Sequence, residues 1–71
     1  MATPVMAPME GKVLSIRAGV GQSVEEDDVI LVMEAMKMEI SVVAPVKGTI
    51  TEIKVSAGQA VDPDTVVAVI G

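Results

Sequence analysis

Lys37 lies between two methionines, in the sequence Ala35-Met36-Lys37-Met38. It is the residue whose side chain is best suited to take part in a chemical reaction. A lysine can act as a Schiff-base or general-base residue, but this needs a buried pocket that favours the neutral amine. Histidine, cysteine and all aromatic residues are absent. Their absence excludes disulfides, thiolate metal sites, Ser-His-Asp catalysis and stacking on nucleobases. An enzyme is therefore the weakest functional class for this chain.

Composition excludes further classes of function. Ten acidic residues against five basic ones give a net charge of −5, which opposes binding to nucleic-acid phosphates and anionic membrane surfaces. The longest uninterrupted apolar run, residues 29–33, is too short to span a bilayer, so we expect no direct membrane insertion. The N-terminus does not resemble a signal peptide, and we expect an intracellular, cytoplasmic location. Seventy-one residues make one domain at most.

The same pattern occurs twice in the chain, with an offset of 37 residues. Residues 7–34 align without a gap over residues 44–71, and ten of the 28 aligned positions are identical. We interpret residues 1–71 as a single domain built from two equivalent halves, which residues 35–43 join as a hairpin. Among the repeated features are Ala7-Pro8 and Ala44-Pro45, Gly11 and Gly48, and Gly21-Gln22 and Gly58-Gln59.

Each half is predicted to form about four short β-strands. The chain has fourteen valines and six isoleucines but only two leucines, and β-branched side chains favour sheets. Residues 12–18 and 49–55 carry apolar residues three positions apart, which fits a β-bulge, a strongly twisted strand or one helical turn. The glycines that follow favour strands. Residues 29–33 and 66–70 are apolar on both faces, as in a closed barrel or sandwich. We therefore expect an all-β fold of two antiparallel sheets related by a pseudo-twofold axis.

Lys37 lies near the middle of the segment that joins the halves. The segments on either side are predicted strands, so the chain must reverse between them. A lysine at such a tip is exposed, with a long side chain that is free to move. If strand geometry continues through the tip, Met36 and Met38 point to the face opposite Lys37. Most lysines are ordinary surface residues, but two large apolar neighbours at an exposed turn favour a surface that contacts other proteins.

The sequence from Glu34 to Glu39 resembles the attachment motif of the biotinyl domains, the biotin carboxyl carrier family. The resemblance covers nearly the whole chain. It includes the Ala-Pro-Met near the start, the paired Gly-x-x-Val segments, the central Ala-Met-Lys-Met and the Ala-Pro that opens the second half. The resemblance implies a flattened β-barrel, or barrel-sandwich hybrid, of two four-stranded antiparallel sheets with pseudo-twofold symmetry. In that fold the lysine lies on a tight hairpin opposite the termini.

The resemblance also implies that Lys37 carries covalently bound biotin. In the family, a biotin protein ligase joins the matching lysine to biotin through an amide. A biotin carboxylase then loads carboxylate onto the biotin ring, and a carboxyltransferase or decarboxylase subunit unloads it. The expected function is thus a non-catalytic carrier whose partners are these proteins and no nucleic acid. The hard chemistry belongs to the cofactor, while the protein supplies position and reach.

The residues around Lys37 receive their expected roles from the same resemblance. Ala35, Met36 and Met38 are expected to form the recognition surface around the attachment site. Glu34 and Glu39 could make polar contacts with the ligase, although solvated charges on the edges of paired strands explain them equally well.

The chain departs from the family pattern at Asp27 and Asp64, where relatives commonly have glycine. Glycine suggests a positive φ, so we expect both aspartates to adopt this conformation at some steric cost. The acidic run of residues 25–28 is interpreted as a solvated turn, because its spacing matches no calcium-binding loop. No extra loop interrupts the first half, as happens in some acetyl-CoA carboxylase carriers. This favours transcarboxylases, pyruvate or acyl-CoA carboxylases and biotin-dependent decarboxylases.

Two other non-enzymatic functions remain as alternatives. Lipoyl domains resemble this fold and also present a lysine on a hairpin, but they usually have an acidic residue before it and a small residue after it. A structural adaptor module without any modification is the second alternative. Such a module has no need of an exposed Met-Lys-Met sequence.

Overall fold

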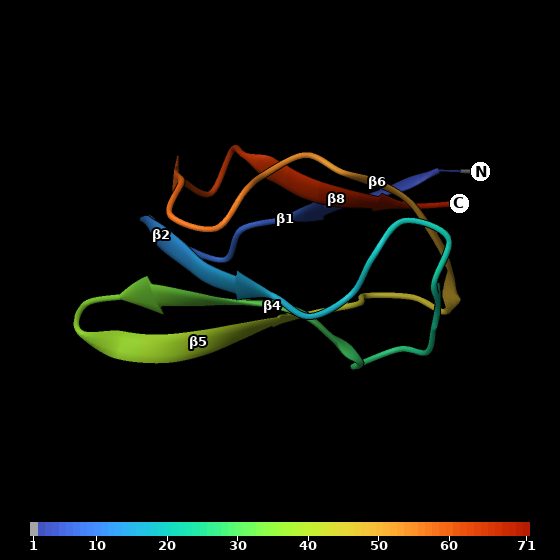
Figure 1. Ribbon diagram of the computed structural model, residues 1–71, viewed down its shortest axis with the longest axis horizontal. Helices are drawn as coiled ribbons and strands as arrows, with labels where there is room; N and C mark the ends of the chain where they lie inside the picture. The colour runs from blue at the N-terminus through green and yellow to red at the C-terminus, as the bar shows by residue number, and fades with distance from the viewer. Residues whose placement is uncertain (1) are drawn as a thin grey trace.

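The chain folds into eight short β-strands, which a computed structural model describes for residues 2–71 (Figure 1). They form two four-stranded antiparallel sheets, with strand orders β1-β8-β6-β3 and β5-β4-β2-β7. The all-β prediction is confirmed. Within the described part of the chain, no helix is long and apolar enough to cross a membrane. The strands are β1 (Thr3–Met6), β2 (Gly11–Ile16), β3 (Ser23–Val24), β4 (Val29–Ala35), β5 (Met38–Val43), β6 (Gly48–Ile53), β7 (Ala60–Val61) and β8 (Val66–Ile70).

The two sheets repeat one arrangement, because the two halves of the chain contribute equivalent strands. Exchanging β1 to β4 with β5 to β8 converts the order of one sheet into the order of the other. The first residues of β2 and β6, Gly11 and Gly48, are separated by the same 37 positions as the sequence repeat. The predicted pseudo-twofold symmetry is confirmed. Each sheet contains strands from both halves, so neither half can form its sheet alone.

The repeated Gly-Gln pairs form equivalent loops. Gly21 N donates a hydrogen bond to Ile50 O (2.7 Å), and Gln22 Oε1 accepts one from Gly19 N (3.1 Å). In the other half, Gly58 N donates a hydrogen bond to Val13 O (2.7 Å), and Gln59 Oε1 accepts one from Ser56 N (3.1 Å). The φ angle is 89° at Gly21 and 91° at Gly58, a region that side chains with a Cβ rarely enter. The repeat thus preserves the glycine and the glutamine that close this loop in each half.

The core lies between the sheets and is entirely apolar among the described residues. The register shifts between Val13 and Ser15 in β2, which agrees with the β-bulge that was one of the three structures compatible with the apolar spacing. A second shift, near the start of β4, lets Ile30 and Leu31 both be buried although they are consecutive. Bulges therefore explain the apolar spacing that departs from strict alternation. The largest fully buried side chains belong to Ile30, Leu31, Met33, Ile50, Ile70, Val13, Val24 and Val67.

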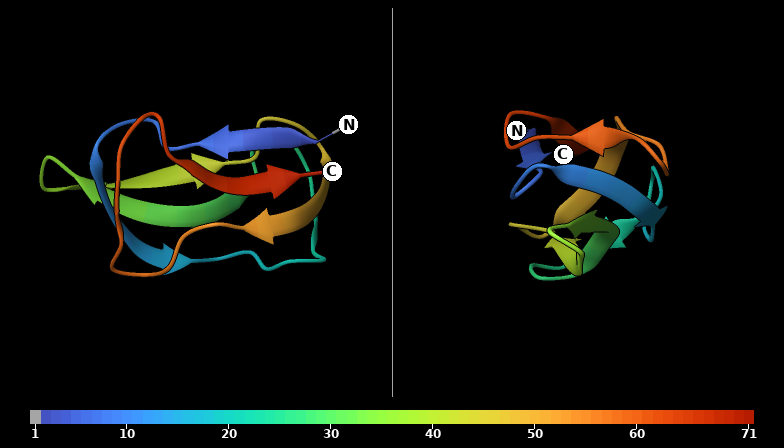
Figure 2. Two further views of the ribbon diagram at one scale, coloured as in Figure 1. Left: turned by 90° about the horizontal axis from the view of Figure 1, so that it is seen from above. Right: turned by 90° about the vertical axis from the view of Figure 1, so that its left-hand side faces the viewer.

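The long axis of the molecule separates the β4–β5 hairpin from the chain ends. The principal extents are 32 × 18 × 17 Å, and the hairpin tip lies at the opposite end of the longest one from the start of β1 and the end of β8 (Figures 1 and 2). Thr3 of β1 pairs with Ile70 of β8, which keeps the chain ends side by side. The hairpin therefore projects away from both ends of the chain.

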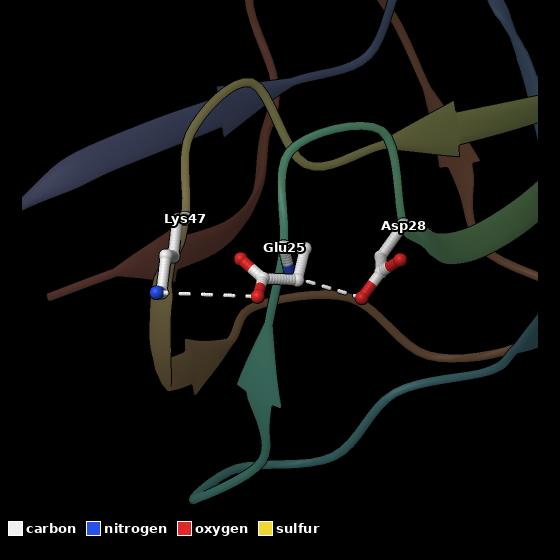
Figure 3. Close-up of polar contacts among 3 residues, drawn as sticks. All are labelled: Glu25, Asp28 and Lys47. Carbon is white, nitrogen blue, oxygen red and sulfur yellow. Dashed lines mark hydrogen bonds and ion pairs between the residues drawn. The ribbon is translucent and has the colours of Figure 1, made fainter.

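The acidic run of residues 25–28 forms a tight turn between β3 and β4. Asp28 N donates a hydrogen bond to Glu25 O (3.1 Å), and Asp28 Oδ2 accepts one from Glu25 N (2.9 Å; Figure 3). Lys47 Nζ lies 4.0 Å from Glu25 Oε1, in an exposed pair of a kind that contributes about 0–1 kcal/mol. No group of side chains in residues 2–71 has the composition and arrangement to hold a metal ion. The carboxylate of Asp28 serves to close this turn.

Asp27 adopts the expected positive φ, 74°, but Asp64 does not, so the prediction was wrong for the second aspartate. Asp62 Oδ1 accepts hydrogen bonds from Asp64 N (2.9 Å) and from Thr65 Oγ1 (3.1 Å). An aspartate whose side chain accepts a hydrogen bond from the amide two residues later stabilises a turn of another kind than the one at Asp27. The first half has Glu25 at the position of Asp62, and its side chain makes no such bond to the described residues. Equivalent positions therefore differ because their neighbours differ.

Replacing Asp27 and Asp64 by glycine is expected to change stability in opposite directions. Asp27→Gly removes a residue from a strained φ and relieves like-charge repulsion, so the free energy of unfolding should be unchanged or rise by up to about 1 kcal/mol. Asp64→Gly gains no relief of strain and adds entropy to the unfolded chain, so stability should fall by roughly 0.5–1 kcal/mol. Urea unfolding at high salt, where charge repulsion is screened, measures the backbone effect. Equal losses in both variants would contradict this explanation.

Candidate functional site

Lys37 occupies a two-residue turn between β4 and β5. Ala35 pairs with Met38 across the hairpin, which leaves only Met36 and Lys37 to reverse the chain. Their φ angles are 53° and 65°. Two consecutive positive φ angles are the property of a type I′ turn, in which Asn-Gly is the usual sequence. Methionine and lysine rarely adopt this conformation, so the tip carries backbone strain at the residues of interest.

The turn overturns one premise of the sequence analysis. Strand alternation stops at Ala35, because Met36 and Lys37 are the two central residues of the turn. The sequence alone suggested that strand alternation places Met36 and Met38 on one face. Because the alternation stops, this reason no longer applies. Both are nevertheless exposed, Met36 to 85% and Met38 to 64%, which makes Met36 the most exposed large apolar residue in the described chain. They are surface residues and not part of the core.

Lys37 is exposed, and the hairpin that contains it projects at one end of the molecule (Figure 2). Lys37 makes no ion pair with any residue from 2 to 71, whereas Lys47 and Lys54 each lie beside a glutamate. No pocket is found among residues 2–71. The geometry can therefore present the amine of Lys37 to another protein.

Ala35 supports the hairpin from inside, so the expectation that its side chain forms part of an exposed surface around Lys37 is corrected. Its side chain is only 4% exposed and packs in the core. Gly11 lies directly beside it, since a Cβ on Gly11 would meet the backbone oxygen of Glu34, the Cε of Met33 at 2.7 Å and the Cβ of Ala35 at 3.1 Å. Gly11 was not among the residues that the sequence predicted at the site. Its identity with Gly48 in the repeat was the only available signal.

Glu34 and Glu39 are directly opposite each other on β4 and β5, and both are exposed. Like charges at such positions destabilise a hairpin. Lys12 of β2 is the partner of Glu34 on its other side, but it makes no ion pair with the described residues. Only Glu39 lies on an edge strand, because β4 is flanked by β5 and β2. Protection of a sheet edge therefore does not by itself explain why both positions are glutamates.

Relieving the strain at Met36 is expected to stabilise the fold. Asparagine enters the positive-φ region more readily than methionine, and the side chain of Met36 is too exposed to contribute much packing. Met36→Asn should raise the free energy of unfolding by roughly 0.5–1 kcal/mol, as measured in urea. The matched variant Met38→Asn lies in β5, where asparagine is disfavoured, and should lower it. A loss of stability in Met36→Asn comparable to that in Met38→Asn would show that Met36 is held by packing.

A family model matches nearly the whole chain, and individual curated relatives match about half of it. A sequence model of a family described as biotin-requiring enzymes matches residues 1–70. The gamma subunit of methylmalonyl-CoA decarboxylase from Veillonella parvula is 47% identical over 38 residues, which are 54% of this chain and 30% of that subunit. The chain spans less than a third of the length of the curated relatives that it matches.

Solved structures share the fold. A part of the urea carboxylase of Kluyveromyces lactis superimposes with a TM-score of 0.94 and 32% identity, over 100% of this chain and 6% of that enzyme. The lipoyl domain of the 2-oxoglutarate dehydrogenase complex from Azotobacter vinelandii has a TM-score of 0.79 and 24% identity, over 96% of this chain and 94% of that domain. The second likeness concerns the fold alone.

Proposed function

Because this chain belongs to the family of biotin-requiring enzymes, we propose that it is a biotin carboxyl carrier domain that carries its biotin on Lys37. The observation that carries this proposal is the position of Lys37, exposed in a two-residue turn at the end of the molecule far from both chain ends. The amine forms an amide with the carboxyl group of biotin, in a reaction that a biotin protein ligase catalyses. Bound biotin supplies the ability to carry a carboxylate.

The protein residues hold and present the attachment point. Twin antiparallel sheets give a rigid body, and the hairpin formed by β4 and β5 extends the lysine from it. Tethering the cofactor to such a body raises its effective concentration at each partner. Met36 and Met38 offer an apolar surface beside Lys37, and Glu34 and Glu39 offer two carboxylates at the cross-strand pair that follows the pair of Ala35 and Met38. The same hairpin can therefore be recognised by the ligase and by each enzyme that uses the cofactor.

The proposed partners are a biotin carboxylase and a carboxyltransferase or decarboxylase subunit. Similarity to the gamma subunit of a decarboxylase and to a region of a urea carboxylase supports a carrier within a larger system of this kind. The domain itself is proposed to be non-catalytic and to act inside the cell. Its contribution is delivery of the cofactor from one active site to another.

Incubation with biotin protein ligase, ATP and biotin tests the proposal directly. We expect the intact mass to increase by one biotinyl group and peptide mapping to place it on Lys37. Loss of one of five positive charges, against ten negative ones, changes the net charge from −5 to −6 and increases mobility on a native gel. A parallel reaction with a lipoate ligase and lipoate should give no product. Lipoylation without biotinylation would instead assign the chain to the lipoyl domains.

A further inference from the structure

We propose that Met36 and Met38 form an oxidation-sensitive modification site, at which peroxide switches off recognition of the Lys37 hairpin. This inference rests on the proposed function and adds a form of control to it. The two methionines are 85% and 64% exposed, whereas Met33 in the core is fully buried. Met6, on β1 of the other sheet, has 40% exposure and provides an internal comparison. The two most exposed methionines in the described part of the chain therefore flank the one lysine in the turn.

The reaction needs only a peroxide. A lone pair of the thioether sulfur attacks one oxygen of hydrogen peroxide, the O–O bond breaks, and a proton transfer releases water. The sulfur loses two electrons and becomes a sulfoxide, while the peroxide is reduced. Access to the sulfur determines the rate, so the exposed positions react first. Sulfoxide reductases reverse the change, which makes it suitable for control.

Oxidation should alter recognition without unfolding the domain. Met36 and Met38 lie outside the apolar core, so adding an oxygen to either sulfur leaves the packing between the sheets unchanged. At a contact with another protein, however, each sulfoxide places a polar oxygen where a flexible apolar side chain was. Burying that oxygen without a hydrogen-bond partner opposes binding. The effect is local to the hairpin and should appear in every reaction that requires contact with it.

The first experiment measures selectivity and is independent of any assigned function. The 71-residue chain is treated with graded hydrogen peroxide, and the oxidised methionines are quantified by peptide mapping while circular dichroism follows the fold. Met36 and Met38 should be oxidised well before Met33, with Met6 intermediate and the folded signal retained. Equal rates at Met36 and Met33, or loss of the fold before oxidation of the hairpin, would overturn the proposal.

The second experiment measures loading by biotin protein ligase, with ATP and biotin, before and after oxidation. The oxidised chain should be biotinylated at least about tenfold more slowly, and methionine sulfoxide reductases should restore the original rate. Met6→Leu should show the same loss as wild type. The double variant Met36→Leu/Met38→Leu should lose nothing further on oxidation, relative to its own untreated rate.

The outcomes separate this inference from the proposed function. If the untreated chain accepts no biotin, the proposed function fails. If the untreated chain is biotinylated and the chain oxidised at both hairpin methionines is biotinylated equally fast, the function stands and the inference is wrong. A loss that persists in the double-leucine variant would place the sensitive residue elsewhere and would also overturn it.

Discussion

The variant Lys37→Arg is expected to accept no biotin at all. Arginine keeps the positive charge and nearly the length of lysine, but its guanidinium stays protonated and its nitrogen lone pairs are delocalised, so it cannot form the amide. Arginine can occupy the same exposed turn, and the free energy of unfolding should remain within about 0.5 kcal/mol of wild type. Intact mass spectrometry after incubation with ligase, ATP and biotin measures the loss.

The other lysines provide matched controls for this variant. Lys12→Arg, Lys47→Arg and Lys54→Arg should each be biotinylated at the wild-type position, because none of these lysines lies in the turn. Lys47 and Lys54 lie beside glutamates, but an arginine preserves such exposed ion pairs. Biotin on the Lys37→Arg protein, at any residue, would refute the assignment of Lys37.

Replacing Gly11 by alanine is expected to cause a large loss of stability. A Cβ at this position would overlap the backbone oxygen of Glu34, which cannot move without disturbing the pairing of β2 with β4. It would also meet the Cε of Met33 and the Cβ of Ala35, which are both buried. Forcing extra volume into such a contact typically costs about 1–3 kcal/mol and occasionally more. We expect a decrease of at least about 2 kcal/mol in urea unfolding, or failure to fold.

Two other glycines make this a graded test. At Gly48, the equivalent of Gly11, an added Cβ would meet the Cγ2 of the buried Ile70 at 2.5 Å and the backbone oxygen of Gly71 at 3.2 Å. Gly48→Ala should therefore also be destabilising, but less than Gly11→Ala because its backbone contact is longer. At Gly19 an added Cβ meets nothing within 4 Å, and Gly19→Ala should leave stability unchanged or raise it by up to about 1 kcal/mol. If Gly11→Ala is as stable as Gly19→Ala, the close approach of β2 to the hairpin strand does not limit the fold.

Much of the fold could be predicted from the sequence, because its information is local or repeated. The excess of β-branched residues indicates strands, and the 37-residue repeat indicates two equivalent halves. An apolar spacing that departs from alternation was compatible with a bulge in β2, and the register shift after Val13 agrees with it. The position of Lys37 between the halves required a chain reversal close to it. These conclusions depend on residue type and order alone.

The details of the site depended on which strands pair and in what register. Pairing of Ala35 with Met38 leaves two residues for the turn, which forces positive φ angles on Met36 and Lys37 and ends the alternation expected there. The same register places Glu34 opposite Glu39. A shift of one residue would have reversed every side chain between core and surface, so local pattern alone could not define the tip.

The burial of side chains and the conformation of the turns depended on neighbours that are distant in the sequence or that differ between the halves. The burial of Ala35 follows from its position in the core beside Gly11, a residue 24 positions earlier in the chain. Asp27 and Asp64 occupy equivalent positions, yet only the second has an aspartate two residues before it that binds its amide. The sequence by itself therefore determined the strands, the symmetry and the region of Lys37. Only the tertiary structure decided which side chains around Lys37 face solvent, because packing between strands sets that choice.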